Sequence, residues 1–169
     1  MKNPLRLVLS VTPLLAVLLL SSLPAMGQEK ELKPGFRDLK WKDPLPSGME
    51  KLDGEGEDGF YKRDADKLSI GDVKLESIHY IFFQNQFSSY IIETKRGSAL
   101  LRILTENWGN PSQDNEFIKK YRWVQGDTRT GYEINEITDE GTLISFSKSL
   151  YQEQEKARKE KAAKAKPDL

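Results

Sequence analysis

The aromatic residues of this chain are confined to one segment. All 16 of them lie between Phe36 and Tyr151. Because large aromatic side chains supply much of the apolar area that a core buries, this segment must contain the folded part of the chain. We therefore predict one domain over residues 34–151 and a charged tail over residues 152–169, either helical or disordered. The chain has no cysteine, so no disulfide bond supports the fold.

The N-terminus has the three parts of a secretory signal peptide. Lys2 and Arg6 flank the start of an apolar run of 14 residues, Leu7–Leu20. Small residues follow at the −3 and −1 positions of a predicted cut between Gly27 and Gln28. The apolar run is shorter than the roughly 20 residues of a membrane-spanning helix, and an uncleaved anchor is the alternative. We expect residues 1–27 to be removed and the protein to be soluble, in a bacterial periplasm or secreted, with no stable membrane anchor.

The charge of the chain is balanced. It has 26 basic and 26 acidic residues, and the predicted signal peptide removes two basic ones, which leaves 24 against 26. Such a protein has no field strong enough to hold nucleic acid or an anionic membrane. Nucleic-acid binding is therefore excluded from the expected functions.

An amphipathic helix is predicted over about residues 98–108. Ser98 is a suitable N-cap, Gly109 can end the helix, and Pro111 prevents its continuation. The apolar residues recur at helical spacing: Leu100, Leu101, Ile103, Leu104 and Trp108. Because only one side is apolar, this helix needs a sheet to pack on.

Strands are predicted on both sides of this helix. The clearest is a hairpin over residues 78–94 with Gln84, Asn85 and Gln86 at its tip. A first strand is expected over residues 36–41, a loop over 49–58, and three strands over 117–124, 132–137 and 142–150. Short Gly-Asp and Asp-Glu-Gly turns between them indicate an antiparallel meander. The predicted fold is α+β, with a meander sheet, one helix packed on a face and a polar C-terminal helix.

An acidic, glycine-rich segment is a candidate calcium site. Asp53, Glu55 and Glu57 alternate with glycines, and Asp64 follows. Carboxylate oxygens are the ligands that calcium prefers. The spacing departs from that of an EF-hand loop, and a solvated loop is the alternative. No other metal site and no cofactor are predicted.

Catalytic motifs are absent from the sequence. His79 is the sole histidine and lies within the strongest strand, where a packed, hydrogen-bonded side chain is expected. Ser145 and Lys148 match a Ser-x-x-Lys pattern, but in a strand these two positions point to opposite faces. We predict that the protein is not an enzyme.

Aromatic residues beside a lysine suggest a binding groove. Lys119, Tyr121 and Trp123 share one face of a predicted strand, and Tyr132 begins the next. Aromatic side chains can line a sugar, lipid or peptide groove, and packing in the core is the alternative.

The chain also carries three short motifs: Phe36-Arg-Asp-Leu-Lys-Trp41 with Pro44-Leu45, Lys67-Leu-Ser-Ile-Gly71, and Leu100-x3-Leu104-x3-Trp108-Gly109-x-Pro111. They resemble segments of small exported bacterial proteins of unknown function, over about residues 35–147. The motifs consist of turn, cap and core positions, so the resemblance implies an envelope location and transfers no catalytic residue.

Two functional hypotheses follow. In the first, the protein is a non-enzymatic domain that binds a protein or peptide partner in the cell envelope. In the second, it binds a small ligand, a lipid or a glycan, in an aromatic groove between helix and sheet.

Overall fold

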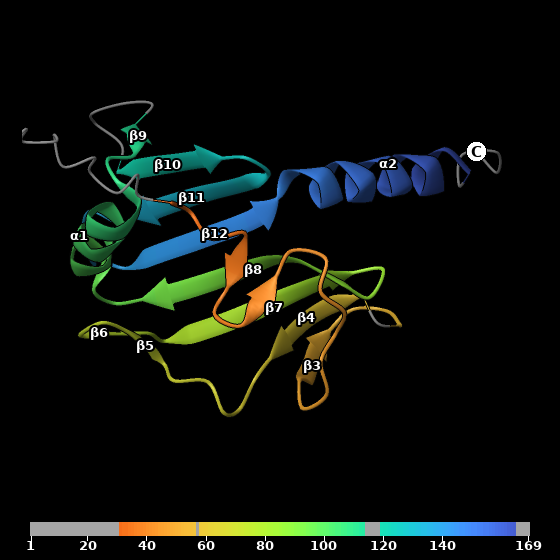
Figure 1. Ribbon diagram of the computed structural model, residues 1–169, viewed down its shortest axis with the longest axis horizontal. Helices are drawn as coiled ribbons and strands as arrows, with labels where there is room; N and C mark the ends of the chain where they lie inside the picture. Colours follow the sequence, from red (N-terminus) through yellow and green to blue (C-terminus); the bar gives the residue numbers. More distant parts are fainter. Residues whose placement is uncertain (1–30, 57, 114–118, 165–169) are drawn as a thin grey trace, which may run out of the picture.

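The structure is a computed structural model that describes residues 31–56, 58–113 and 119–164. Within these residues, eight strands form one antiparallel sheet (Figure 1). The strands lie in the order β3 (Glu50–Asp53), β4 (Gly59–Lys62), β7 (Ser77–Phe83), β8 (Gln86–Thr94), β12 (Gly141–Ser147), β11 (Thr128–Ile134), β10 (Lys120–Gln125) and β9 (Ser112–Gln113). The predicted signal peptide, with its cleavage site at Gly27 and Gln28, lies outside the described residues.

Two meanders meet in the middle of the sheet. β3, β4, β7 and β8 form one of them, β9 to β12 form the other, and β8 pairs with β12. Helix α1 (Gly97–Trp108) carries the chain from β8 at the centre to β9 at the far edge. This arrangement confirms the predicted α+β fold, with an antiparallel meander sheet and one amphipathic helix packed on it.

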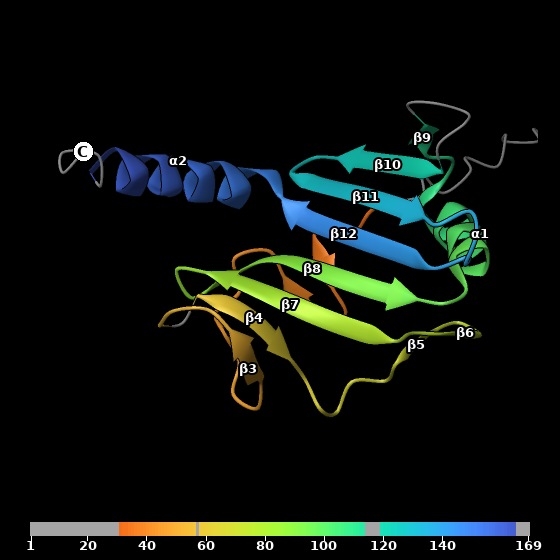
Figure 2. The ribbon, with the colours of Figure 1, turned by 180° about the vertical axis from the view of Figure 1, so that it is seen from behind.

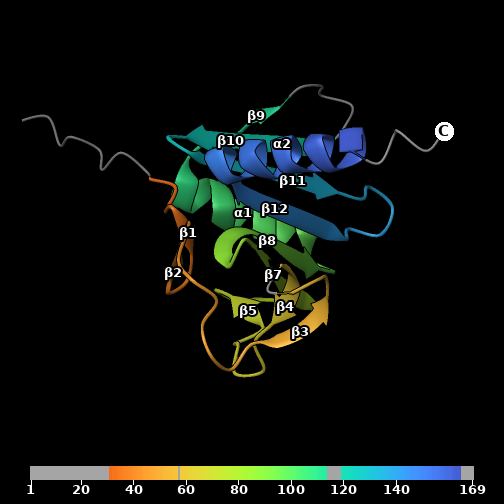
Figure 3. The same ribbon diagram turned by 90° about the vertical axis from the view of Figure 1, so that its right-hand side faces the viewer.

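One face of the sheet carries the core. Side chains alternate along β12, where Leu143 is fully buried while Thr142 and Ile144 on either side of it are exposed. Besides α1, two small hairpins pack on this core face, β1–β2 (Gly35–Phe36 and Leu39–Lys40) and β5–β6 (Ser69–Ile70 and Val73–Lys74). Figure 3 shows the β1–β2 hairpin standing to one side of the sheet.

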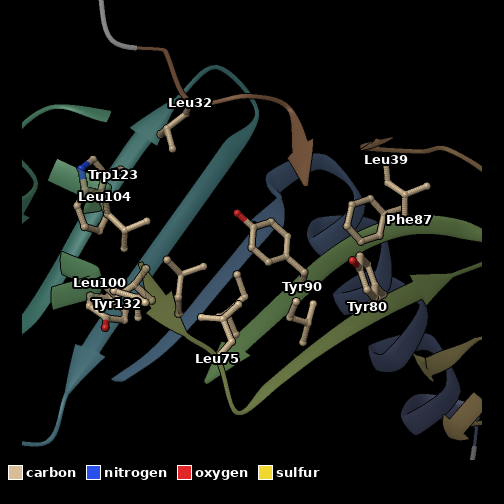
Figure 4. Close-up of a cluster of buried hydrophobic side chains, with 14 of the residues drawn as sticks. Leu32, Leu39, Leu75, Tyr80, Phe87, Tyr90, Leu100, Leu104, Trp123 and Tyr132 are labelled. Atoms are coloured by element: carbon tan, nitrogen blue, oxygen red, sulfur yellow. The ribbon is translucent and has the colours of Figure 1, made fainter. Parts of the chain in front are cut away.

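Aromatic rings fill much of the core. Phe36 of the β1–β2 hairpin stacks on Tyr90 of the sheet with ring centroids 4.4 Å apart, and Trp108 of α1 meets Trp123 edge to face at 5.6 Å. Figure 4 shows Tyr90 with Phe87 on one side and Trp123 on the other. The confinement of aromatic residues to one segment therefore reflects a core that ties the β1–β2 hairpin and α1 to the sheet.

The predicted hairpin over residues 78–94 is confirmed. β7 and β8 are joined by a two-residue turn, in which Gln84 and Asn85 have φ angles of 51° and 59°. Positive φ at both central residues is the geometry whose twist matches that of the flanking strands.

The expected cap of α1 at Ser98 is wrong. The helix begins at Gly97, and Arg96 in the N-cap position makes no side-chain cap bond. The carboxylate of Asp139 supplies the cap instead, because it accepts hydrogen bonds from the backbone N–H (3.0 Å) and the hydroxyl (2.6 Å) of Ser98. The bond from the Ser98 hydroxyl is the main cause that lowers the pKa of Asp139.

Four further segments differ from the sequence prediction. The strand expected over residues 132–137 is β11, which begins four residues earlier and ends at Ile134. Residues 36–41 do not form one strand, because the chain turns at Arg37 (φ 56°) and pairs β1 with β2. Residues 50–53, expected in a loop, form β3 and pair with β4. The last strand ends at Ser147 rather than residue 150, because α2 (Lys148–Lys164) begins there and Asp127 accepts a hydrogen bond from the backbone N–H of Ser149 (2.9 Å).

α2 is the polar C-terminal helix that was predicted, and it extends away from the end of β12 (Figure 1). Leu150 is the one buried residue among those described in α2. No helix in residues 31–56, 58–113 or 119–164 has both the length and the apolar character needed to cross a membrane.

Candidate functional site: the uncovered face of the sheet

The described residues leave the second face of the sheet largely uncovered (Figure 2). Among the described residues, no helix or strand lies over its centre, since α1 and both small hairpins pack on the core face. The first turn of α2 reaches one corner, where the ring of Tyr151 lies 5.2 Å from that of Phe146. The centre of this face is therefore available for contact with another molecule.

Six apolar side chains lie together on this face and are called the apolar stripe below. Cross-strand pairing aligns Phe60 with Ile81 and Ile91 with Ile144, and it places Phe146 and Val124 on either side of Arg129. The stripe consists of Phe60, Ile81, Ile91, Ile144, Phe146 and Val124. Val124 is 63% exposed, Ile144 43% and Phe60 39%. Exposed apolar side chains gathered on one face of a protein are a feature of interaction sites.

Gly131 opens a hollow in the middle of the face. It pairs with Ile144 on one side and Arg122 on the other, and a Cβ added to it would meet no heavy atom within 4 Å. Two adjoining depressions of about 190 and 320 Å³ include Gly131 and Arg122 in their walls. Ile144 lines the first of them, and Phe146 and Val124 line the second. The missing side chain thus leaves space for a side chain of another molecule.

The strands beside the hollow are basic. Lys120, Arg122 and Arg129 project from β10 and β11 on this face, as does the carboxylate of Glu133. Glu133 pairs with Lys120 at 3.0 Å, and Arg129 donates to the backbone carbonyls of Gly126 (2.8 Å) and Thr128 (2.9 Å). The hollow therefore has apolar walls on the β12 side and basic side chains on the β10 side.

The residues predicted to line an aromatic groove lie on the core face. Trp123 and Tyr132 are 4% and 2% exposed, and they donate hydrogen bonds to the carbonyls of Gly109 (2.9 Å) and Gly97 (2.8 Å). Tyr121 pairs with Tyr132 and is half-buried against the same core. Lys119, also half-buried, precedes β10, and its carbonyl accepts a bond from the backbone N–H of Ile134.

The hollow lies on the opposite face of these same strands. The sequence analysis did not identify Gly131 as a site residue. One signal was present, because a glycine inside a strand often marks the close approach of a ligand or another backbone.

The predicted calcium ligands are only partly described. Asp53 accepts a hydrogen bond from the backbone N–H of the next residue, Gly54 (2.8 Å), and Asp64 lies 3.8 Å from the Nζ of Lys62. Glu55 is exposed, and Glu57 lies outside the described residues. The described residues contain no group of three or more His, Asp or Glu side chains placed to hold a metal ion. Calcium binding stays a prediction.

The structure does not bring His79, Ser145 and Lys148 together in a catalytic arrangement. His79 is half-buried on the uncovered face, opposite Ile91. Ser145 is buried in β12, with its hydroxyl 2.8 Å from that of Thr130, and Lys148 begins α2. Within the part of the chain that the structure describes, no nucleophile, base and orienting acid come together.

The uncovered face, with its apolar stripe, its hollow and its basic strands, is thus the candidate site. The chain was also compared with protein-family models, curated proteins and solved structures, and none of them matches it. Its function must therefore be inferred from the chemistry of this face.

Proposed function

We propose that this protein is a non-enzymatic binding module that docks a protein partner on the uncovered face of its sheet. The observation that supports the proposal is the apolar stripe. An antiparallel sheet with one solvated face normally carries polar residues there. This face carries the six apolar side chains of the stripe, and three of them, Ile144, Phe146 and Val124, border the hollow at Gly131. Covering them with a partner removes this apolar area from water, which favours association.

The chemistry of the face suggests the chemistry of the partner. The hollow at Gly131 fits an apolar side chain, because Ile144 and Phe146 form part of its walls. The guanidinium of Arg129, which bonds the neutral carbonyls of Gly126 and Thr128, favours carboxylates flanking that side chain, since complementary charge steers and orients association. We therefore propose a partner segment with an exposed apolar residue between acidic residues.

Docking on the face is favoured over strand addition at an edge of the sheet. Edge strand β9 has two residues, and edge strand β3 carries the charged residues Glu50, Lys51 and Asp53. Short and charged edge strands resist pairing with another chain. The face offers the larger apolar surface.

We place this function in the bacterial cell envelope, after export and removal of the signal peptide. The support for this location is the pattern of residues 1–27 and the resemblance to small exported bacterial proteins. Extracellular secretion is consistent with the same pattern.

The proposal is tested by site-specific photo-crosslinking in the envelope fraction of the host. A photoreactive amino acid replaces Val124, which is 63% exposed, and the matched control replaces Lys74, an exposed residue of the β5–β6 hairpin. The same experiment is repeated with Gly131→Leu, which fills the hollow. The expected result is one adduct from position 124 that Gly131→Leu abolishes and that position 74 does not form.

The crosslinked peptide identifies the occupant. An apolar residue flanked by Asp or Glu supports the proposal. An adduct that survives Gly131→Leu, or the absence of any adduct, contradicts it. A peptide from this chain itself would show that the face pairs two copies, and it would also contradict docking of a different protein.

A further inference from the structure

A pocket of about 300 Å³ lies on the other side of the sheet, between the last turn of α1 and the N-terminal segment of the described chain. Trp108 of α1 and Leu32 and Phe36 of the N-terminal segment line it, and the sheet contributes Tyr90 and Ser145. Leu32 is held there by a hydrogen bond from its backbone N–H to Oε1 of Gln125 (2.5 Å). The pocket shares no lining residue with the hollow at Gly131.

The sheet side of the pocket carries buried hydroxyl groups. Tyr90 and Ser145 are 3% and 1% exposed, and both line the pocket. The Ser145 hydroxyl is also 2.8 Å from that of Thr130. Figure 4 shows the Tyr90 hydroxyl directed away from Phe87, toward the side where Leu32 and Trp123 lie.

The Tyr90 hydroxyl is the group of this wall that can serve a ligand. The Ser145 hydroxyl already pairs with that of Thr130. The Tyr90 side chain lines the pocket, and its phenolic O–H can donate one hydrogen bond. Burial raises the pKa of Tyr90 to about 12, so at neutral pH its hydroxyl stays protonated and can donate.

The walls and the rim restrict the ligand further. Phe36 and Trp108 present aromatic rings, which pack well on another ring. Glu31 and Lys33 at the rim have opposite charges, and Arg37 is already paired with Asp66 and with the carbonyl of Lys67. The rim therefore has no excess of free charge that would select an ionic ligand.

We infer that this pocket binds a small neutral aromatic molecule with one hydroxyl group, of the size of a substituted phenol. The volume is sufficient, because an engineered apolar cavity of about 150 Å³ holds benzene. The aromatic ring packs against Phe36 and Trp108, and the ligand oxygen accepts the hydrogen bond that Tyr90 has available. The pocket lies between helix and sheet, where the second functional hypothesis expects a ligand.

The test is a titration of the full mature chain with two fluorinated probes, followed by ¹⁹F NMR. 4-Fluorophenol carries the hydroxyl group, and fluorobenzene is the matched probe without it. We expect 4-fluorophenol to bind about 2- to 10-fold more tightly, which is the worth of one net hydrogen bond. Tyr90→Phe should abolish this preference and leave the fluorobenzene affinity unchanged. The control Tyr121→Phe, on the same face of the sheet but outside the pocket, should retain the preference.

A second measurement on the unmodified protein locates the probe. Intermolecular NOEs from 4-fluorophenol to Leu32 and Trp108 support the pocket, even where Tyr90→Phe fails to fold. The inference is overturned if neither probe binds at millimolar concentration, if Tyr90→Phe keeps the preference, or if the NOEs come from Val124 and Ile144. Failure here leaves the docking proposal intact, because that proposal rests on the opposite face.

Discussion

Asp139 and Ser98 are joined by two hydrogen bonds, although 41 residues separate them in the sequence. The carboxylate lies in the turn between β11 and β12 and caps the start of α1. Asp127, in the turn between β10 and β11, does the same for α2, since it accepts bonds from the backbone N–H (2.9 Å) and the hydroxyl (3.0 Å) of Ser149. The second meander therefore holds the first turn of both helices.

Removing the Asp139 carboxylate should destabilise the fold. Asp139 has a φ of 58°, so Asp139→Gly keeps the backbone relaxed while it deletes the cap. We expect the free energy of unfolding in urea to fall by about 1 kcal/mol, the usual worth of an N-cap. Ser98→Ala removes only the hydroxyl bond and should cost less. A larger loss for Ser98→Ala would show that Asp139 is not the cap.

The same carboxylate should make stability depend on pH. The Ser98 hydroxyl lowers the pKa of Asp139 below its ordinary value of 3.8 in the folded protein. The stabilisation is therefore complete above that value and is lost as the pH falls through the lower, folded pKa. Urea unfolding between pH 6 and pH 2 should show a smaller decline for Asp139→Asn than for the unmodified protein. Asp64→Asn, at a side chain 80% exposed, should leave the decline unchanged.

Two glycines of neighbouring strands should respond in opposite ways to the same substitution. A Cβ at Gly131 meets nothing within 4 Å. Gly131→Ala should therefore raise the free energy of unfolding by about 0.5 kcal/mol, because alanine lowers the conformational entropy of the unfolded chain. A Cβ at Gly141 meets the Tyr132 hydroxyl, and it lies 2.9 Å from the Cα of Gly97. Gly141→Ala should therefore cost about 1–3 kcal/mol. Thermal unfolding of both variants checks the pair, and equal effects would mean that the hollow is not open.

Most of α2 should be dispensable for folding. A chain that ends at Gln152 keeps the buried Leu150 and the contact of Tyr151 with Phe146. Its melting temperature should stay almost unchanged. A chain that ends at Ser147 loses Leu150 and the bonds from Ser149 to Asp127, and its melting temperature should fall clearly. Unfolding of the longer truncated chain would show that residues 153–169 belong to the core.

Elements defined by neighbouring residues were predictable. Helix α1 follows from an apolar repeat that ends at Gly109 and Pro111, and the β7–β8 turn follows from the polar residues at its tip. The cap at Ser98 was predicted wrongly, because a capping residue adjacent in sequence and one from a distant turn cannot be distinguished by local pattern. Gly131 was missed for a related reason, since its meaning depends on Ile144 and Arg122 on the adjacent strands.

The apolar positions of β7 show most clearly what could not be predicted from the sequence. Ile78, Tyr80 and Phe82 alternate with His79, Ile81 and Phe83, and two apolar faces favoured a strand in the middle of a sheet. β7 does lie between β4 and β8. Only the face of Tyr80 is packed under the β1–β2 hairpin, however, and Ile81 belongs to the apolar stripe.

The sequence by itself determined which segment folds, its α+β class and most of its local elements, because these depend on periodicity, turn residues and aromatic content within short stretches. Only the tertiary structure decided which face of the sheet is covered, how Asp139 and Asp127 cap the helices, and where the hollow and the pocket lie. Each of these depends on the pairing of β8 with β12 and on the return of the N-terminal segment over the sheet. Those contacts join residues dozens of positions apart, and their register cannot be predicted from any local sequence pattern.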